Sequence, residues 1–414
     1  MILYSKTHKA LSLFISFIPA ALVAGAAVME LFIVLACFTF FFLNFKKIGL
    51  NYYHRKFSKF FFIFCLFLIF SSIVSEYVLH CIKNTAFYFR YGILILSIWY
   101  LLDHYKKFKY LFFYSISLTL LVVIIYSFLQ IFILHNVVQA DRISGLFGTE
   151  LIQGSYLLRI IPIFIIFYFY NKDNLVESSS ILFFSILISA FILITLSGER
   201  ASIFLMFVGI FLSIFFLRTS LVRIFFLILL ISFIFIVTIK LYPKSQVRVI
   251  NYTYNQIFDK ADSSNHSQIY LFSEGHQNHF KTALLIFKQN YLTGVGVRNF
   301  RLECKKNIYD NVGRYHCSTH PHNTYMQLLS ETGLIGFSFF ISFIIFILIK
   351  IFKFLKVAYS NKKKINVPLA ISFVVICINF FPFITTGSFF NNWMSTLYFI
   401  PVALLLYELN LKKI

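Results

Sequence analysis

Residues 110–134 read YLFFYSISLTLLVVIIYSFLQIFIL, a run of 25 residues without a charged side chain. About 20 consecutive apolar residues are enough for a helix to cross the hydrocarbon core of a bilayer, so this run predicts a transmembrane helix. Similar runs recur along the whole chain. The predicted spans, twelve in all, are about 10–26, 28–45, 60–79, 84–102, 110–134, 150–170, 178–196, 201–217, 220–241, 334–352, 367–385 and 389–408.

The composition of the 414 residues indicates the same class, because 59% are hydrophobic and only 13% are charged. An ordinary soluble domain carries roughly 25% charged residues. A soluble enzyme, a disordered chain and a fibrous repeat are therefore excluded, and the sequence predicts an all-α polytopic membrane protein. The first apolar stretch continues past Pro19 and Gly25, which is too long for the apolar part of a cleaved signal peptide. We expect it to be a retained signal-anchor.

The basic residues set the expected orientation of the chain. A formal net charge of +22 can indicate a nucleic-acid partner. Here, however, many of the Lys and Arg residues lie in the short loops 46–59, 103–109 and 350–364 and in the tail at 412–413. Such loops face the cytoplasm. With twelve spans, all of them lie on the cytoplasmic side together with both termini, and no nucleic-acid partner is expected.

This orientation predicts the domain organisation. Residues 1–241 hold the first nine spans, residues 242–333 form a loop domain with short helices on the outer face, and residues 334–414 hold the last three spans. The shorter segments 135–149, 197–200 and 386–388 share the outer face. Six of the eleven histidines lie in 242–333, so any chemistry is expected there.

Two of the six cysteines lie in the polar outer loop. Cys304 and Cys317 are thirteen positions apart, and in an oxidising periplasm they could pair and close a hairpin just before His320. The alternative is two unrelated thiols. Pairing is favoured because the predicted orientation places both residues outside the cytoplasm.

The most distinctive outer segment, CSTHPHNTYMQLLSETGLIG at 317–336, contains a predicted helix. The helix runs from Asn323 to Glu331, with Gly333 as its C-cap. Asn323 or Thr324 is suited to cap its first turn.

His320 and His322 lie directly before this helix, on either side of a proline. A helix N-terminus disfavours the charged form of a nearby histidine, which leaves a neutral ring able to accept a proton. A general base is therefore the first interpretation. A structural pair bonded to loop backbone is the second. A metal site ranks last, because no cysteine or carboxylate partner is close in sequence.

Two arginines are predicted at the outer surface of the membrane. The segment LSGERAS at 196–202 places Arg200 between two apolar runs, and its planar guanidinium suits phosphate oxygens. The alternative is an interfacial anchor. The segment DRISGLFGTE at 141–150 places Arg142 beside glycines that let the backbone approach a ligand, although Asp141 and Arg142 could equally form a plain turn.

A fourth outer cluster combines SEGHQNH at 273–279, an amphipathic helix at 280–289, and TGVGVRNF at 293–300. The Gly294–Gly296 element lacks the strand, crossover helix and acidic residue of a dinucleotide-binding motif. We interpret it as a tight turn that closes a helical hairpin against the membrane.

The order of SGER, TGVGVRNF and HPHNTYMQLLSETGLIG resembles the O-antigen ligase and polymerase superfamily over about 135–400. The His-x-His-Asn helix after Gly-x-Gly is the most specific part, and TGSFFNNW at 386–393 looks like the late outer turn of the family. The resemblance implies a GT-C-like bundle that acts in lipopolysaccharide biosynthesis in the bacterial inner membrane, with the active site facing the periplasm.

The resemblance also implies a mechanism. Such enzymes are metal-independent, inverting glycosyltransferases without a cofactor, which move a glycan from undecaprenyl diphosphate to an acceptor hydroxyl. Arg200 would hold the donor diphosphate, and His322 would be the general base, with His320 as the second choice. The acceptor is lipid A–core in a ligase and a second lipid-linked glycan in a polymerase.

The chain departs from the family at one position. Members commonly place a second arginine before the amphipathic helix, where this chain has His276 or Gln277. Either neutral donors hold the diphosphate there, or another cation substitutes, such as Arg298, Arg248 or Arg142.

Ligation to lipid A–core is the leading hypothesis, and polymerisation is the alternative within the same chemistry. A transporter of charged lipids or solutes is an alternative from another class, with Arg90, Arg142 and Arg200 along its pathway. No internal repeat supports it. A non-catalytic scaffold leaves the histidines near outer arginines unexplained.

Overall fold

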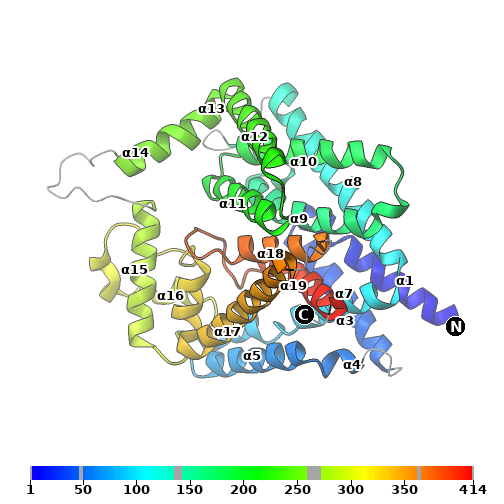
Figure 1. Ribbon diagram of the computed structural model, residues 1–414. Coiled ribbons are helices and arrows are strands. Elements are labelled where there is room, and N and C mark those ends of the chain that lie inside the picture. Colours follow the sequence, from blue (N-terminus) through cyan, green and yellow to red (C-terminus); the bar gives the residue numbers. More distant parts are fainter. Residues whose placement is uncertain (1, 46–49, 135–141, 259–271, 361–364, 413–414) are drawn as a thin grey trace.

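The computed structural model describes residues 2–45, 50–134, 142–258, 272–360 and 365–412 (Figure 1). Several residues used above lie outside these ranges: Lys46, Lys47, Asp141, His266, Lys362, Lys363, Lys364 and Lys413. The described residues form helices and connecting turns without a strand, so the predicted all-α class is confirmed. Helices suit a bilayer because they satisfy every backbone hydrogen bond internally.

The first half of the chain contains α1 (Ile2–Ser16), α2 (Ile18–Ala24), α3 (Ala26–Phe45), α4 (Leu50–Tyr53), α5 (Lys56–Ile73), α6 (Val78–Thr85), α7 (Arg90–His104), α8 (Lys107–Leu129), α9 (Gln153–Asn171) and α10 (Ser178–Leu196). The second half contains α11 (Arg200–Phe216), α12 (Leu221–Leu241), α13 (Pro243–Gln246), α14 (Tyr252–Phe258), α15 (Glu274–Gln289), α16 (Phe300–Glu303), α17 (Thr324–Ser360), α18 (Val367–Asn379) and α19 (Asn392–Lys412). Short η turns join several of them.

Nine helical segments within the described ranges are long and apolar enough to cross a membrane. A tenth forms if α1 and α2, which meet at a bend of 42°, count as one span. The two remaining predicted spans correspond to α11 and α18, which have 17 and 13 residues and are shorter than the about 20 residues typical of a full crossing. The polytopic membrane fold is therefore confirmed, whereas the count of twelve spans is not.

The centre of the bundle is formed by four helices, because α19 packs on α7 and α18 packs on α9. The side chains of these helices are mostly buried, including Tyr91, Phe164 and Tyr398. In contrast, α12 buries only Thr238 and Ile239 and leaves its other apolar side chains exposed or half-buried, as expected for a helix that faces lipid.

The outer unit is built around a break in α17. Gly333 has φ 62° and ψ −167°, so a short helix from Thr324 ends there before the long apolar part begins, in agreement with the predicted C-cap. Asn323 caps the start, since its side-chain oxygen accepts the backbone N–H groups of Tyr325 and Met326 at 3.0 and 3.1 Å. Helix α15 packs against α17 beside this break (Figure 1).

The glycine turn before α16 lies directly on the break. The N–H of Gly296 donates to the carbonyl of Glu331 at 2.9 Å, and the N–H of Leu334 donates to the carbonyl of Tyr291 at 2.8 Å. A Cβ on Gly294, which has φ 68°, would come within 2.4 Å of the backbone of Glu331. The turn thus closes the α15–α17 hairpin, and only glycine fits at this approach.

Candidate functional site

A cavity of about 1060 Å³ opens where the outer unit meets the membrane helices. Its walls come from the α2–α3 junction, the segment 142–155, α9, the start of α11, α15, α16, the histidine loop and the turn 385–394. Six arginines, two glutamates and three histidines line it: Arg142, Arg159, Arg200, Arg248, Arg298, Arg301, Glu150, Glu199, His276, His320 and His322. This lining strongly favours an anionic ligand.

His322 lies between the outer unit and this cavity. Its Nε2 is 3.0 Å from the hydroxyl oxygen of Ser318, and no described residue forms a hydrogen bond with its Nδ1. Its backbone is held in the left-handed region with φ 57°. Burial, together with neighbouring His320, lowers the pKa of His322 to about 3, which keeps the ring neutral at physiological pH. If Nε2 carries the proton and donates it to Ser318, Nδ1 is left as a free acceptor facing the cavity.

His320 differs because both of its ring nitrogens are engaged. Nε2 donates to the carbonyl of Thr386 at 3.2 Å, and Nδ1 is 3.0 Å from the hydroxyl of Thr319. Burial lowers its pKa to about 4, and the positive charge of Arg301 contributes to this shift. The geometry therefore favours His322 over His320 as the group that accepts a proton.

Two further histidines, from α15, complete a cluster around His322. The rings of His276 and His279 lie 5.1 and 5.3 Å from the ring of His322, and that of His320 lies 4.0 Å away. Burial lowers the pKa of His276, and the charge of Arg200 lowers it further. All four rings are thus disposed to remain neutral. Nowhere in the described ranges do three or more His, Cys, Asp or Glu side chains form a group suited to a metal ion.

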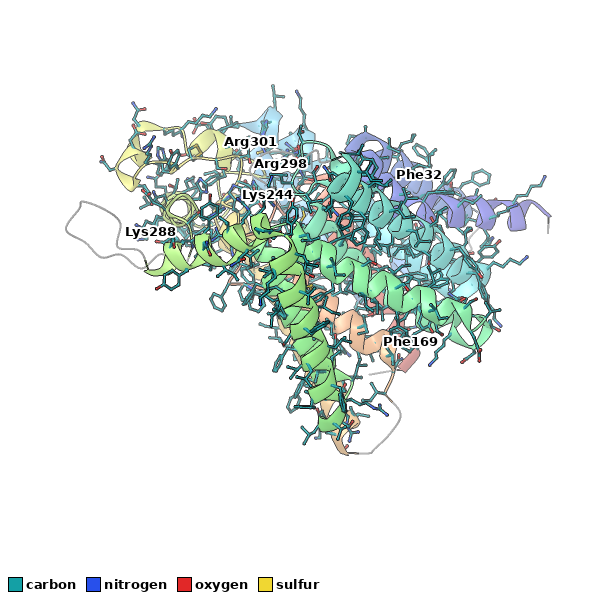
Figure 2. The ribbon with its side chains drawn as sticks, turned by 90° about the horizontal axis from the view of Figure 1, so that it is seen from above. Phe32, Phe169, Lys244, Lys288, Arg298 and Arg301 are labelled. Atoms are coloured by element: carbon teal, nitrogen blue, oxygen red, sulfur yellow. A yellow bond between two sulfur atoms is a disulfide. The ribbon has the colours of Figure 1, made fainter. Side chains whose placement is uncertain are left out.

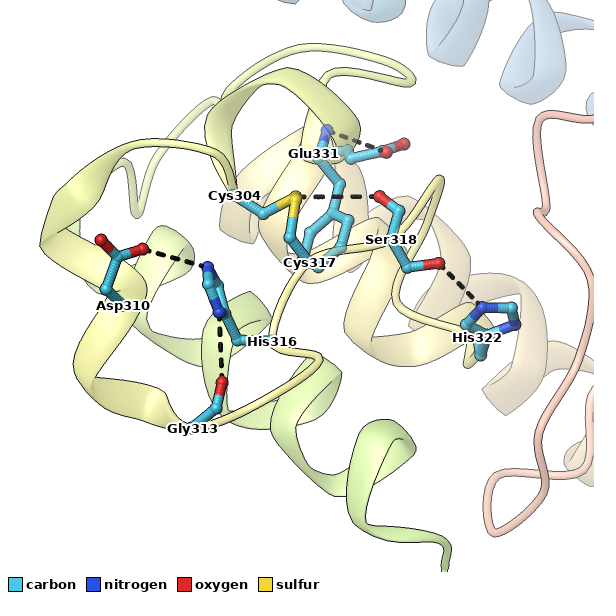
Figure 3. Close-up of a disulfide and its surroundings, with 9 residues drawn as sticks. Cys304, Asp310, Gly313, His316, Cys317, Ser318, His322 and Glu331 are labelled. Atoms are coloured by element: carbon cyan, nitrogen blue, oxygen red, sulfur yellow. Dashed lines mark hydrogen bonds and ion pairs between the residues drawn. A yellow bond between two sulfur atoms is a disulfide. The ribbon is translucent and has the colours of Figure 1, made fainter.

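A disulfide between Cys304 and Cys317 joins the end of α16 to the histidine loop (Figure 3). The sulfur of Cys304 lies 3.7 Å from the carbonyl oxygen of Ser318, the residue whose hydroxyl contacts His322. The cross-link therefore fixes the position of the loop that carries the base.

Glu199 organises the opposite side of the cavity. Its carboxylate accepts the backbone N–H groups of Gly154 at 2.7 Å and Ser155 at 3.0 Å, and the hydroxyl of Ser202 at 3.0 Å. It also lies 3.9 Å from the guanidinium of Arg142. The tripeptide Gly-Glu-Arg thus ties α9 to α11 through its acidic residue, while Arg200 extends into the cavity.

Three arginines lie at this tripeptide, and one of them, Arg200, belongs to it. Arg200 donates to Gln256 at 2.9 Å, Arg248 donates to the carbonyl of Gly198 at 3.2 Å, and Arg142 donates to the carbonyl of Leu151 at 3.0 Å. Burial lowers the pKa of Arg142, and the charge of Arg248 acts in the same direction. We call Arg142, Arg200 and Arg248 the first arginine group.

Arg298 and Arg301 form a second arginine group, on α16 and the turn before it, and lie next to each other in the view from above (Figure 2). Arg298 donates to the side-chain oxygen of Asn84 at 2.8 Å. The Nε atoms of both guanidinium groups are buried and have no hydrogen-bond partner among the residues that the structure describes.

Residues 183–341 match the family model described as O-Antigen ligase. This match supports an assignment to the O-antigen ligase superfamily. No curated protein matches the chain. The match supports an O-antigen ligase-like membrane glycosyltransferase activity, and it includes both arginine groups except Arg142, together with the histidine cluster.

The structure brings most of the sequence-predicted site residues together. His322, His320, His276, Arg142, Arg200 and Arg298 all line the cavity. Gln277 does not, because its amide donates to the carbonyl of Phe272 at 3.4 Å. His276 and Gln277 lie where the family commonly has a second arginine, and His276 is therefore the one that reaches the site.

Sequence reasoning missed three residues of the site. Arg159, only 2% exposed, lies in α9 at the floor of the cavity, and its position inside a predicted span was a usable signal. Arg301 lies one helical turn after Arg298. Glu199 was part of a quoted motif, but its anchoring role depends on contacts with α9 that the sequence pattern does not contain.

Proposed function

We propose that this protein transfers a glycan from undecaprenyl diphosphate to an acceptor hydroxyl, with ligation to lipid A–core as the reaction. The observation that carries the proposal is the free Nδ1 of His322 at a cavity lined by six arginines. A lipid-linked diphosphate needs cations at its leaving group, and an acceptor hydroxyl needs a base. Both are present here, within one cavity at the membrane surface.

In the proposed reaction, the acceptor oxygen attacks the anomeric carbon of the donor sugar. Its proton passes to Nδ1 of His322. The bond between that carbon and the phosphate oxygen breaks, and the leaving diphosphate keeps the electron pair. Attack from the face opposite the leaving group inverts the configuration at this carbon. No metal ion is required by this scheme, because guanidinium groups neutralise the charge that develops on the diphosphate.

The first arginine group is the proposed diphosphate site. Arg200 is anchored by Gln256 and keeps part of its fork for a ligand. Arg248 and Arg142 lie beside the same tripeptide, so they supply the second cation that the family places before α15. His276, whose neutral ring occupies that family position, is proposed to donate a hydrogen bond rather than a charge. The proposed site thus combines the two alternatives for the missing family arginine: a neutral donor, His276, and a substituting cation, Arg248 or Arg142.

The proposed location is the bacterial inner membrane, with both termini in the cytoplasm, residues 242–333 as a periplasmic domain and spans before and after it. The disulfide between Cys304 and Cys317 supports this orientation, because structural disulfides persist in oxidising compartments.

The test is transfer by the purified protein in vesicles that contain a lipid-linked glycan donor. Wild-type protein should form glycosylated lipid A–core, and His322→Ala should lose this product while it remains inserted and folded. Full activity of His322→Ala would contradict the base assignment. Longer lipid-linked chains without core product would identify a polymerase. Movement of the donor across the vesicle without any new bond would identify a transporter.

A further inference from the structure

The cavity contains more positive charge than the proposed donor can neutralise. Its six guanidinium groups exceed its two carboxylates by four positive charges. A diphosphate diester carries about two negative charges. One of the carboxylates, Glu199, is already engaged by backbone N–H groups and by Arg142. The excess suggests that a second anionic group enters the same cavity.

The positive charge of the cavity belongs to two arginine groups, and a histidine lies near each of them. His276 is close enough to Arg200 for that charge to lower its pKa, whereas the pKa of His320 is lowered by Arg301. His322 contacts both rings, at 5.1 and 4.0 Å between ring centres. The proposed base therefore contacts one histidine near the first arginine group and one near the second, and all of them line the same cavity.

The second arginine group has no acidic partner in the described part of the chain. Elsewhere, Arg90 forms an ion pair with Glu30 at 2.9 Å, and Arg142 lies 3.9 Å from Glu199. The nearest carboxylate to the second group, Glu331, uses its oxygens to accept the backbone N–H groups of Arg298 and Phe300. Two adjacent guanidinium groups with unpartnered buried Nε atoms repel each other unless an anion lies between them.

The second arginine group is also held rigidly in place. Arg298 has φ 61°, and its N–H donates to Glu331 at 2.9 Å. Arg301 lies on α16, whose last residue precedes Cys304 of the disulfide. Arginines held in this way keep their geometry before a ligand arrives, which reduces the entropic cost of binding.

We propose that Arg298 and Arg301 bind a phosphate group of the acceptor and so place the acceptor hydroxyl at His322. This assignment rests on the proposed function. The phosphate has two possible sources, a phosphorylated sugar of lipid A–core or the diphosphate of a second lipid-linked glycan. In both cases the acceptor anion binds the second arginine group and the donor diphosphate binds the first.

The main test compares Arg301→Gln with wild type in vesicles, with donor and acceptor concentrations varied separately. Among the described residues, Nε of Arg301 has no hydrogen-bond partner, and the melting temperature of the variant serves as the check that the fold is intact. Loss of a charged hydrogen bond to phosphate should raise the acceptor KM about ten-fold or more. The donor KM should change by less than about two-fold. Arg298→Gln should act in the same direction.

Arg314→Gln is the matched control, because Arg314 is an exposed cation of the same outer unit that does not line the cavity. It should leave both KM values unchanged. The two sources are separated by the acceptor: phosphatase-treated core oligosaccharide should lose the effect of Arg301→Gln in a ligase, whereas a lipid-linked glycan acceptor should show the effect in a polymerase. An equal rise in donor KM would instead assign these arginines to the donor and overturn the proposal.

A binding measurement separates failure of this proposal from failure of the proposed function. Phosphorylated core oligosaccharide and a soluble glycosyl diphosphate can be titrated onto the full-length His322→Ala protein, in which no transfer takes place. Weaker binding of the phosphorylated core oligosaccharide after Arg301→Gln, with little change for the glycosyl diphosphate, supports the acceptor site even if the wild-type protein transfers no glycan. Unchanged binding of both probes would refute it even if the wild-type protein is active.

Discussion

Ser318 is expected to position the base, and its replacement by alanine tests the proposed role of His322. The hydroxyl of Ser318 lies 3.0 Å from Nε2 of His322 and is the only hydrogen-bond partner of that ring among the described residues. Without it, the ring can rotate, and the proton can move to Nδ1, where it blocks the base. Ser318→Ala should therefore lower kcat and leave both KM values nearly unchanged.

The expected magnitude follows from one neutral hydrogen bond. Such a bond contributes about 0.5–1.5 kcal/mol net, which corresponds to a kcat about two- to thirteen-fold lower. Single-turnover transfer in vesicles, with saturating donor and acceptor, measures this directly. Ser318→Thr keeps the hydroxyl and should recover most of the rate. Ser338→Ala, whose hydroxyl contacts only its own helix backbone, is the control. An unchanged kcat in Ser318→Ala, or an equal loss in Ser318→Thr, would refute the reasoning.

Four further outcomes follow from the same contacts. Arg200→Lys should raise the donor KM by roughly ten-fold, because lysine keeps the charge but loses the planar fork; unchanged turnover at low donor concentration would contradict this. Glu199→Gln should weaken donor binding and lower the melting temperature, since the carboxylate joins α9 to α11; equal melting curves would count against it. Replacing Cys304 and Cys317 by serine should cost about 3 kcal/mol for a loop of this length, measured by thermal unfolding with and without reductant. The pKa of His322 is lowered to about 3, so the unfolded chain binds more protons between pH 3 and 6.5; stability should fall as the pH drops below about 6.5, and His322→Gln should flatten this dependence.

The hydrophobic pattern predicted the helices well because each apolar run is long and has few charges. Every predicted span overlaps a helix, and the break at Gly333 and the cap at Asn323 follow from local backbone chemistry. What the pattern did not predict is the length of α18, which ends at Asn379 and not near residue 385. Apolar composition predicts which segment can cross a membrane, but it does not predict the residue at which the helical hydrogen bonds end.

The histidine loop was predictable as a candidate site, but the choice between its two histidines was not. His320 and His322 both precede the same helix, so the helix dipole acts on both. Their difference depends on Thr386, which is 66 positions from His320 and occupies one ring nitrogen of that residue. Ser318 leaves a nitrogen of His322 free. Only the folded chain brings these partners together.

Arg90 and Arg159 show most clearly which information a single sequence lacks. Both are arginines inside predicted apolar spans, and such residues are expected to face a partner or a cavity. In the structure, Arg90 forms a two-oxygen contact with Glu30 and does not line the cavity. Among the described residues, Arg159 forms no ion pair with a carboxylate, donates to Ser155 through Nη1, and lines the cavity with no hydrogen-bond partner at its Nε. The difference lies in whether a glutamate from another helix is within reach. A guanidinium neutralised by the protein serves the fold, and one left without an anion is available to a substrate.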